Sequence, residues 1–231
     1  LGVGFETTAP GIAAAIMQAE QEGIPNLSVL SLHKLTPPAM RAILDAGEIA
    51  LDGIIGPGHV SAVIGSNAWQ FLPQRYGMAC AVAGFEPLDL LSAIAALVHA
   101  VAEGEPQVTN TYARSVRPEG NLVAQHMLGS VFDVGPAAWR GFGEIADSGL
   151  HIKPSLAHRD AAKRFPVHVE RVNEPKGCRC GEVLRGVVNP EECALFRRVC
   201  TPRNPIGPCM VSAEGACAAY YQYAEVIDDR P

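Results

Sequence analysis

The amino-acid sequence predicts an α/β fold built on a parallel sheet, followed by a small cysteine-rich domain. Over the first 105 residues, short and nearly continuous apolar runs alternate with segments of helical periodicity. This alternation is typical of a parallel sheet that helices cover on both faces. From residue 167 onward the sequence becomes dense in cysteine, glycine and proline. We therefore predict a Rossmann-like α/β domain over residues 1–165 and a cysteine-rich domain over residues 166–231.

The elements of the first domain follow from local signals. Apolar runs predict four strands, over residues 3–5, 27–32, 52–55 and 78–83. Capping residues and apolar spacing predict three helices, over residues 8–23, 36–47 and 90–101. Thr8 and Thr36 are the N-caps of the first two, each followed by proline, and glycines end both helices. The third helix repeats large apolar residues on one face: Leu90, Leu91, Ile94, Leu97, Val98 and Val101.

Residues 106–165 are less regular. A helical pattern covers residues 119–132, a strand or two is expected over residues 139–152, and a short polar helix over residues 157–164. The chain starts at Leu1 rather than at methionine, and its first five residues resemble the end of a buried strand. We therefore expect that an upstream part is missing from this sequence.

Composition excludes several classes of protein. Of the 231 residues, 48% are hydrophobic and 18% are charged, which excludes an intrinsically disordered chain. The net charge is −6 and Lys and Arg form no run, so neither a nucleic acid nor an anionic membrane surface is expected as a partner. No apolar stretch reaches the ~18 residues that a membrane span needs. The sequence shows no export signal, and a cytoplasmic location is expected.

Six of the seven cysteines lie in the last quarter of the chain: Cys178, Cys180, Cys193, Cys200, Cys209 and Cys217. The disulfide framework of a small secreted domain fits badly, because a long and nearly cysteine-free segment precedes them. A zinc ribbon needs tight Cys-x-x-Cys pairs, which are absent from this sequence. Four thiolates that converge in space can enclose an iron–sulfur cluster, which leaves two further thiols. A structural zinc ion with two spare cysteines remains the alternative.

The Cys178-x-Cys180 spacing suggests how a further thiol is used. In extended backbone, residues i and i+2 share a face, whereas a turn at residues 179–181 would splay the two thiols apart. One of them could then ligate iron while the other lies beside the cluster as a redox thiol. The seventh cysteine, Cys80, lies in an apolar strand and is expected to be a buried core thiol.

Two further segments place polar side chains directly after predicted strands: Glu6, Thr7 and Thr8 after the first strand, and His59 and Ser61 after the third. In open parallel sheets, ligands bind in the crevice beyond the carboxyl ends of the strands. These five residues are therefore candidates for a ligand-binding cleft. The alternative is that the two segments provide ordinary helix caps and solvated loop residues. The remaining histidines show no metal-ligand spacing and are interpreted as structural or surface residues.

Four motifs stand in order along the chain: GFETTAP at residues 4–10, GPGHVS at 56–61, CRCGEVLRG at 178–186 and GPCMVSAEGAC at 207–217. Together they resemble the HypD family of [NiFe]-hydrogenase maturation proteins, and the similarity runs to about Tyr223. The resemblance implies a protein with a [4Fe–4S] cluster. It also implies two partners, a HypC-type chaperone and a HypE-type cyanide donor, with which the Fe(CN)2CO group of the hydrogenase active site is assembled.

The resemblance also divides the six clustered cysteines. Cys178, Cys193, Cys200 and Cys217 match the cluster ligands. Cys180 and Cys209 match a dithiol/disulfide pair beside the cluster, an arrangement similar to ferredoxin–thioredoxin reductase. The five strand-end residues are then expected to line a cleft near the iron group.

One departure from the family pattern limits these expectations. The family's Cys-Gly-Gly-His-Thr-His segment, which holds the iron being built, and an additional Cys-x-x-Cys pair are absent from these 231 residues. We therefore expect the transient Fe(CN)2CO iron to be held mainly by the missing N-terminal part. Two other functions compete with the maturation scaffold: a free-standing iron–sulfur disulfide reductase, and a zinc-stabilised interaction module.

Overall fold

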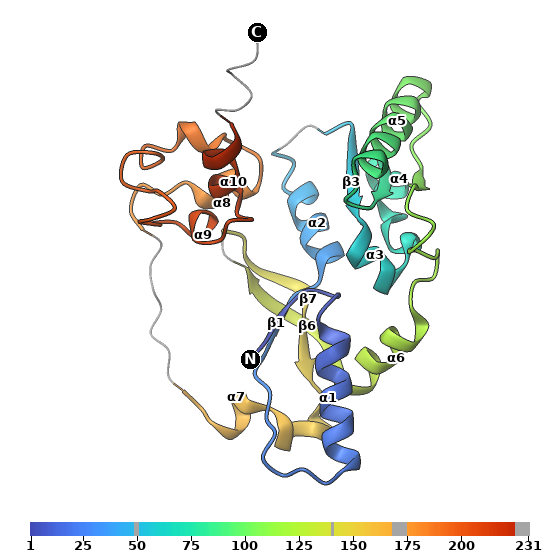
Figure 1. The fold of residues 1–231 in the computed structure, drawn as a ribbon, viewed down its shortest axis with the longest axis vertical. Helices are drawn as coiled ribbons and strands as arrows, with labels where there is room; N and C mark the ends of the chain where they lie inside the picture. The colour runs from blue at the N-terminus through green and yellow to red at the C-terminus, as the bar shows by residue number, and fades with distance from the viewer. Residues whose placement is uncertain (49–50, 140, 168–174, 225–231) are drawn as a thin grey trace. The chain divides into compact units, whose positions relative to one another are not determined.

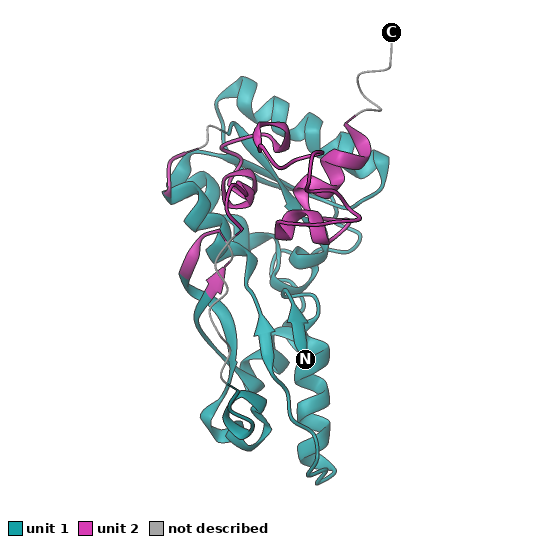
Figure 2. Ribbon diagram, turned by 90° about the vertical axis from the view of Figure 1, so that its left-hand side faces the viewer, with its two compact units in different colours: residues 1–45, 50–137, 145–167 teal, residues 46–49, 138–144, 168–231 magenta. Residues whose placement is uncertain are grey.

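The structure is a computed structural model that describes residues 1–48, 51–139, 141–167 and 175–224. Strands and helices alternate along the first half of the chain, which confirms the predicted α/β class (Figure 1). Contacts within the chain define two compact units (Figure 2). Unit 1 comprises residues 1–45, 50–137 and 145–167, and unit 2 comprises residues 46–49, 138–144 and 168–231. Across the described ranges, no helix is long and apolar enough to cross a membrane.

Unit 1 contains two parallel sheets. Strand β1 (Gly2–Gly4) pairs with β2 (Ser31–His33), and Val3 lies opposite Leu32. A second sheet has the order β3-β4-β5, formed by Gly53–Pro57, Ala79–Ala83 and Val108–Asn110. All pairings in these two sheets are parallel, as predicted. The division of the strands between two sheets was not predicted.

Strand β4 is buried on both faces, as the sequence predicts for a parallel sheet. On one face, Cys80 and Val82 pack in a core with Trp69 and Leu72. On the other face, Ala81 packs with Ala83 against a helix. Strand β3 continues to Pro57, two residues beyond the predicted end at residue 55. Gly56 pairs with Val82 within the strand, and the lack of a side chain allows close packing, because a Cβ there would lie 3.1 Å from the Cys80 sulfur.

Three helices of unit 1 match the predicted ones: α1 (Ala9–Gln21), α2 (Thr36–Asp45) and α5 (Pro87–Glu103). Helix α1 has Thr8 at its N-cap and ends before Gly23, whose φ is +65°. Short helices connect β3 to β4, and these were not predicted: α3 (Gly58–Ile64), the 3-10 helix η1 (Ser66–Trp69) and α4 (Phe71–Tyr76).

Helix α5 packs on the sheet with its small residues rather than its large ones. Ala93 and Ala100 are buried, while Leu91 is 64% exposed and Val98 is 62% exposed. Strand β4 is built from alanine, cysteine and valine, so an alanine face lets the helix approach closely. Of the six large apolar residues that repeat along this helix, Leu97 is partly buried against the sheet and the other five are exposed, so most of the predicted apolar face is not the buried one.

A second core of unit 1 lies between α1, α6 (Leu122–Val131) and the two-stranded sheet of β6 (Phe132–Trp139) and β7 (Gly143–Ile152). The predicted helix over residues 119–132 is present but shorter, because the Asn121 side chain accepts a hydrogen bond from the Ala124 N–H at 3.1 Å and caps it there. Strand β6 was not predicted before residue 139. The 3-10 helix η2 (Pro154–Arg159) and α7 (Ala161–Arg164) complete this region.

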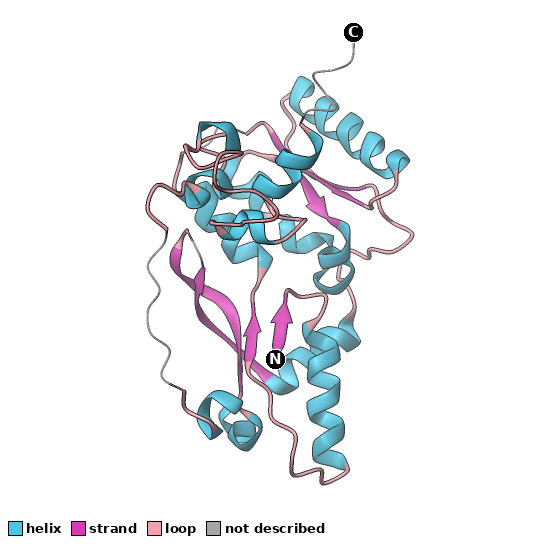
Figure 3. Ribbon diagram, turned by 60° about the vertical axis from the view of Figure 1, so that its left-hand side comes forward, coloured by secondary structure: helices cyan, strands magenta, loops and turns pink. Residues whose placement is uncertain are grey.

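Within residues 175–224, unit 2 is made of short helices joined by loops (Figure 3). These are α8 (Cys180–Leu184), the 3-10 helix η3 (Pro190–Glu192), α9 (Pro208–Val211) and α10 (Ala216–Tyr223). Its core consists largely of cysteines, together with Val183, Phe196, Met210 and Ala218. A core this small contributes little hydrophobic stabilisation, so cross-links between the cysteines matter more here than in unit 1.

Candidate metal and redox centre

The structure gathers all six clustered cysteines of unit 2 around one small cavity. Five of them are buried and Cys178 is partly buried. The rest of the lining contains neither carboxylate nor imidazole groups. It consists of Val183, Leu195, Phe196, Gly207 and Met210. The sequence separates the first and last of these thiols by 39 residues (217 − 178), and the loops of unit 2 bring them together.

Short helices position three of the thiols. Cys180 is the first residue of α8, Cys209 lies in α9, and Cys217 lies at the start of α10. Helices α9 and α10 pack against each other and both contact α8. The other three cysteines stand outside these helices, where turns set their direction.

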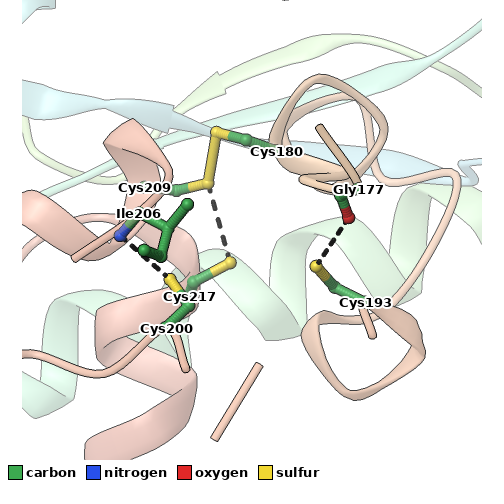
Figure 4. Close-up of a disulfide and its surroundings, with 7 residues drawn as sticks. All are labelled: Gly177, Cys180, Cys193, Cys200, Ile206, Cys209 and Cys217. Atoms are coloured by element: carbon green, nitrogen blue, oxygen red, sulfur yellow. Dashed lines mark hydrogen bonds between the residues drawn. A yellow bond between two sulfur atoms is a disulfide. The ribbon is translucent and has the colours of Figure 1, made fainter. Parts of the chain in front are cut away.

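Cys180 and Cys209 form a disulfide across 29 residues of chain, with their Cα atoms 6.2 Å apart (Figure 4). The other four cysteines of unit 2 take part in no disulfide. The pair that the resemblance assigned to a dithiol/disulfide couple is therefore the pair that the fold brings into contact. The four cysteines assigned as cluster ligands are the four that remain as thiols.

Three of these four sulfurs have distinct neighbours (Figure 4). The Cys217 thiol lies 3.6 Å from the Cys209 sulfur. The Cys193 thiol donates to the Gly177 carbonyl at 3.8 Å, and the Ile206 N–H donates to the Cys200 sulfur at 3.4 Å. A backbone N–H donated to sulfur stabilises a thiolate, which is the form that binds metal.

Electrostatics also indicate that the four cysteines outside the disulfide are neighbours. Burial, together with the nearby charges of Cys193, Cys200 and Cys178, raises the pKa of Cys217 to about 11. Four thiolates could not share this site without a cation, because each would raise the pKa of the others.

The donor chemistry fits an iron–sulfur cluster, since such clusters are held by four cysteine thiolates in apolar surroundings. The enclosed volume is only about 10 Å³, so the cysteine side chains would have to turn outward to admit a cluster. Within the described residues, no three Cys, His, Asp or Glu side chains are arranged to hold a single metal ion.

Two glycines that the sequence analysis did not single out allow the close packing of this centre. A Cβ at Gly207 would lie 2.5 Å from the Cys178 sulfur, and a Cβ at Gly215 would clash with the Cys209 carbonyl oxygen. Each glycine stands two residues before a cysteine, in Gly207-x-Cys209 and Gly215-x-Cys217. The repeated Gly-x-Cys spacing was the available signal.

The first strand-end segment has a structural role in unit 1. Glu6 is 1% exposed, and its carboxylate accepts hydrogen bonds from the Thr36 N–H at 2.7 Å and the Thr36 hydroxyl at 2.8 Å. Glu6 is thus no solvated loop residue; it caps the first turn of α2. Burial raises the pKa of Glu6, and these hydrogen bonds partly offset the rise. Thr7 is exposed, and the exposed Thr8 donates its hydroxyl to the carbonyls of β1 and the following turn.

The second strand-end segment divides in the same way. Ser61 is fully buried, donates to the Pro57 carbonyl at 2.8 Å and accepts from the Trp69 indole N–H at 2.8 Å. His59 is exposed and stacks on the exposed Phe85, with 4.4 Å between ring centroids. His59 is therefore available to a ligand, whereas Ser61 already has partners within unit 1.

A cavity of about 430 Å³ in unit 1 is lined by Glu6 and mainly apolar side chains from α2, α6, β6 and β7. His59 and Ser61 are not among its lining residues. Of the five residues expected to line one cleft, this cavity contains Glu6 alone. Cys80 is buried as predicted, and burial raises the pKa of its thiol to about 12.

Comparison with known proteins decides the family. A family model for HypD, described as "Hydrogenase formation hypA family", matches residues 1–224. The chain belongs to the HypD family. Members of this family are therefore its relatives over the α/β unit and the cysteine-rich unit alike.

Several curated HypD-family relatives are similar over almost the whole chain. The hydrogenase maturation factor HypD of Cupriavidus necator is 45% identical over 99% of this chain and 62% of the relative. That of Azotobacter vinelandii is 47% identical over 96% of this chain and 60% of the relative. A putative hydrogenase expression/formation protein of Methanocaldococcus jannaschii is 39% identical, over 98% and 63%. The chain thus spans about three fifths of the length of these relatives.

Proposed function

We propose that the chain acts in hydrogenase maturation, as a scaffold and electron-relay protein in the assembly of the Fe(CN)2CO group. Membership of the HypD family supports the maturation role. The observation that carries the relay role is the cysteine centre, in which a disulfide and four further cysteines surround one cavity. The partners in this proposal are a HypC-type chaperone and a HypE-type protein, in the cytoplasm.

In this proposal, Cys178, Cys193, Cys200 and Cys217 hold a [4Fe–4S] cluster. All four line the same cavity, and its lining offers no competing oxygen or nitrogen side-chain ligand. The surrounding Phe196, with Tyr220 and Tyr221 packed on its ring, keeps this side of the site apolar. When bound, such a cluster would supply one-electron redox chemistry.

The Cys180–Cys209 disulfide is the two-electron partner. Two electrons and two protons cleave the S–S bond and leave two thiols. Oxidation of these thiols releases the electrons and protons and restores the disulfide. The Cys217 sulfur lies 3.6 Å from Cys209, so a proposed ligand and the disulfide are in direct contact. Cys180 and Cys209 thereby convert between one-electron and two-electron chemistry beside the metal.

The transient Fe(CN)2CO iron is substrate in this proposal, and we place it near Glu6, Thr7, Thr8, His59 and Ser61. His59 is the best supported of these five, because it is exposed at the carboxyl end of β3. Its imidazole N–H can donate a hydrogen bond to a cyanide nitrogen. Ser61 and Glu6 act by holding the local backbone through their bonds to Trp69 and Thr36.

Hydrogenase activity in the producing cell tests this function. We expect Cys193→Ser or Cys209→Ser in the chromosomal gene to abolish [NiFe]-hydrogenase activity, with immature large subunit accumulating. Cys80→Ser is the matched control, because Cys80 is buried outside unit 2. Normal hydrogenase activity in the first two variants would refute the maturation role. Loss of activity in Cys193→Ser alone would refute the relay role of the disulfide.

A further inference from the structure

The Cys180–Cys209 disulfide has a third sulfur aligned with it. The Cys217 thiol lies 3.6 Å from the Cys209 sulfur. Figure 4 shows the Cys217 sulfur on the side of Cys209 that is opposite to Cys180. Thiol–disulfide exchange needs this approach, because the attacking sulfur enters opposite the sulfur that leaves.

We propose that Cys217 exchanges with this disulfide, so that the centre has two disulfide pairings. The Cys217 thiolate attacks the Cys209 sulfur, a Cys209–Cys217 bond forms, and the Cys180–Cys209 bond breaks. The bonding pair leaves on Cys180, which takes up the proton that Cys217 lost. The reaction consumes neither oxidant nor reductant, and the chain keeps one disulfide and five thiols, since it has seven cysteines.

The local backbone favours Cys217 as the attacking thiol. Gly215 packs directly on the Cys209 backbone, where a Cβ would clash, and this contact holds the start of α10 against α9. Cys193 and Cys200 have their sulfurs on the Gly177 carbonyl and the Ile206 N–H instead. Cys217 and Cys209 are eight residues apart, so the second pairing closes a short loop that the fold has already formed.

The two pairings have different consequences for metal binding, and this step rests on the proposed function. With Cys180–Cys209 oxidised, all four proposed cluster ligands are thiols. With Cys209–Cys217 oxidised, one of the four is removed and Cys180 is released. A cluster ligated by Cys217 and the second pairing therefore exclude each other, and the disulfide position controls whether Cys217 is available as a ligand.

Disulfide mapping of the purified, metal-free full chain tests the exchange without relying on iron. The protein is incubated without oxidant at mildly alkaline pH, quenched with an alkylating agent over minutes to hours, and digested for mass spectrometry. We expect the Cys209–Cys217 cross-linked peptide to rise while alkylation moves from Cys217 to Cys180. The cross-link should be absent in Cys217→Ser and present in the control Cys200→Ser.

A second variant guards against a fold defect. In Cys180→Ser, mild oxidation should give Cys209–Cys217 as the main disulfide, at least tenfold above any pairing of Cys193 or Cys200. Wild-type protein that retains only Cys180–Cys209, together with unpaired Cys209 and Cys217 in oxidised Cys180→Ser, would overturn the inference. Iron content of the cluster-loaded protein is measured separately, so a failure to bind iron would count against the proposed function and leave the exchange result intact.

Discussion

At the scale of single residues, two buried ionisable side chains, Glu6 and His33, contribute to the packing of unit 1. Glu6 bridges the end of β1 to the first turn of α2 through two hydrogen bonds to Thr36. His33 in β2 is 1% exposed, and its Nδ1 lies 3.1 Å from the Ser31 hydroxyl. Glu6 follows strand β1 and His33 lies in strand β2, and both side chains are buried within unit 1.

Removing the Glu6 carboxylate should destabilise unit 1. Glu6→Ala leaves the Thr36 N–H buried without its acceptor, and the loss of such a cap costs about 1–2 kcal/mol in the free energy of unfolding. Glu6→Gln keeps one carbonyl acceptor and should cost less. Urea unfolding of both variants, against the exposed Glu105→Ala as control, measures the difference. Equal stability of the alanine and glutamine variants would contradict the capping role.

Stability should also depend on the protonation of His33. Burial lowers the pKa of His33 below its ordinary value of 6.5, and its Nε2 has no partner among the described residues. The unfolded chain therefore binds the proton more tightly than the folded chain. The stabilisation is fully present above pH 6.5 and is lost as the pH falls through 6.5 towards the lower folded pKa.

Replacement of His33 by leucine should flatten this pH dependence. The free energy of unfolding, measured with urea between about pH 5 and 8, should fall in the wild type as the pH falls. The slope should correspond to the uptake of at most one proton on unfolding. In His33→Leu the free energy of unfolding should fall less. His99→Gln is the control, since His99 is exposed and paired with Glu103 on α5. A wild-type curve that His33→Leu does not alter would exclude His33 as the source.

At the scale of elements, helix α5 shows an inverted pattern. Its alanines pack on β3 and β4, while Leu88, Leu91 and Val98 are mostly exposed. Apolar periodicity located the helix correctly because spacing is a local property. It did not identify the buried face, because that depends on the small side chains of β4, which are distant in sequence.

Substitutions on the buried face of α5 should therefore change the free energy of unfolding more than substitutions on its exposed face. Ala93→Leu inserts a large side chain into a fully buried position and should cost about 1–3 kcal/mol. Leu91→Ala on the exposed face should change stability by less than about 0.5 kcal/mol. Chemical unfolding of the two variants gives the comparison. A larger loss in Leu91→Ala than in Ala93→Leu would contradict the observed packing.

The sequence predicted most helices and strands of unit 1, since caps such as Thr8 and apolar runs such as residues 78–83 act locally. The division of the strands between two sheets and the strand at Phe132 were not predicted, because both depend on distant pairing. The same limit applied to the candidate cleft. Glu6 bonds to Thr36 and Ser61 bonds to Trp69, and neither partner can be identified from the motif that contains Glu6 or Ser61.

At the scale of the whole molecule, the two units differ in what stabilises them. Unit 1 has aliphatic and aromatic cores around its two sheets. Unit 2 has a core in which cysteines make up most of the buried cluster. Convergence of the cysteine motifs could be predicted from the sequence, because the ligands of one metal centre must lie close together. The chemistry of the centre depends on what the four cysteines outside the disulfide bind. We propose that they bind a [4Fe–4S] cluster.

Metal and sulfide analysis after anaerobic purification tests this claim most directly. We predict about four iron atoms and four acid-labile sulfides per chain. Single serine substitutions of Cys178, Cys193, Cys200 or Cys217 should lower both contents, whereas Cys80→Ser should leave them unchanged. Cys180→Ser should also retain iron, because Cys180 is not one of the proposed ligands. One zinc ion per chain without sulfide, or full iron content in Cys193→Ser, would contradict cluster binding by these four cysteines.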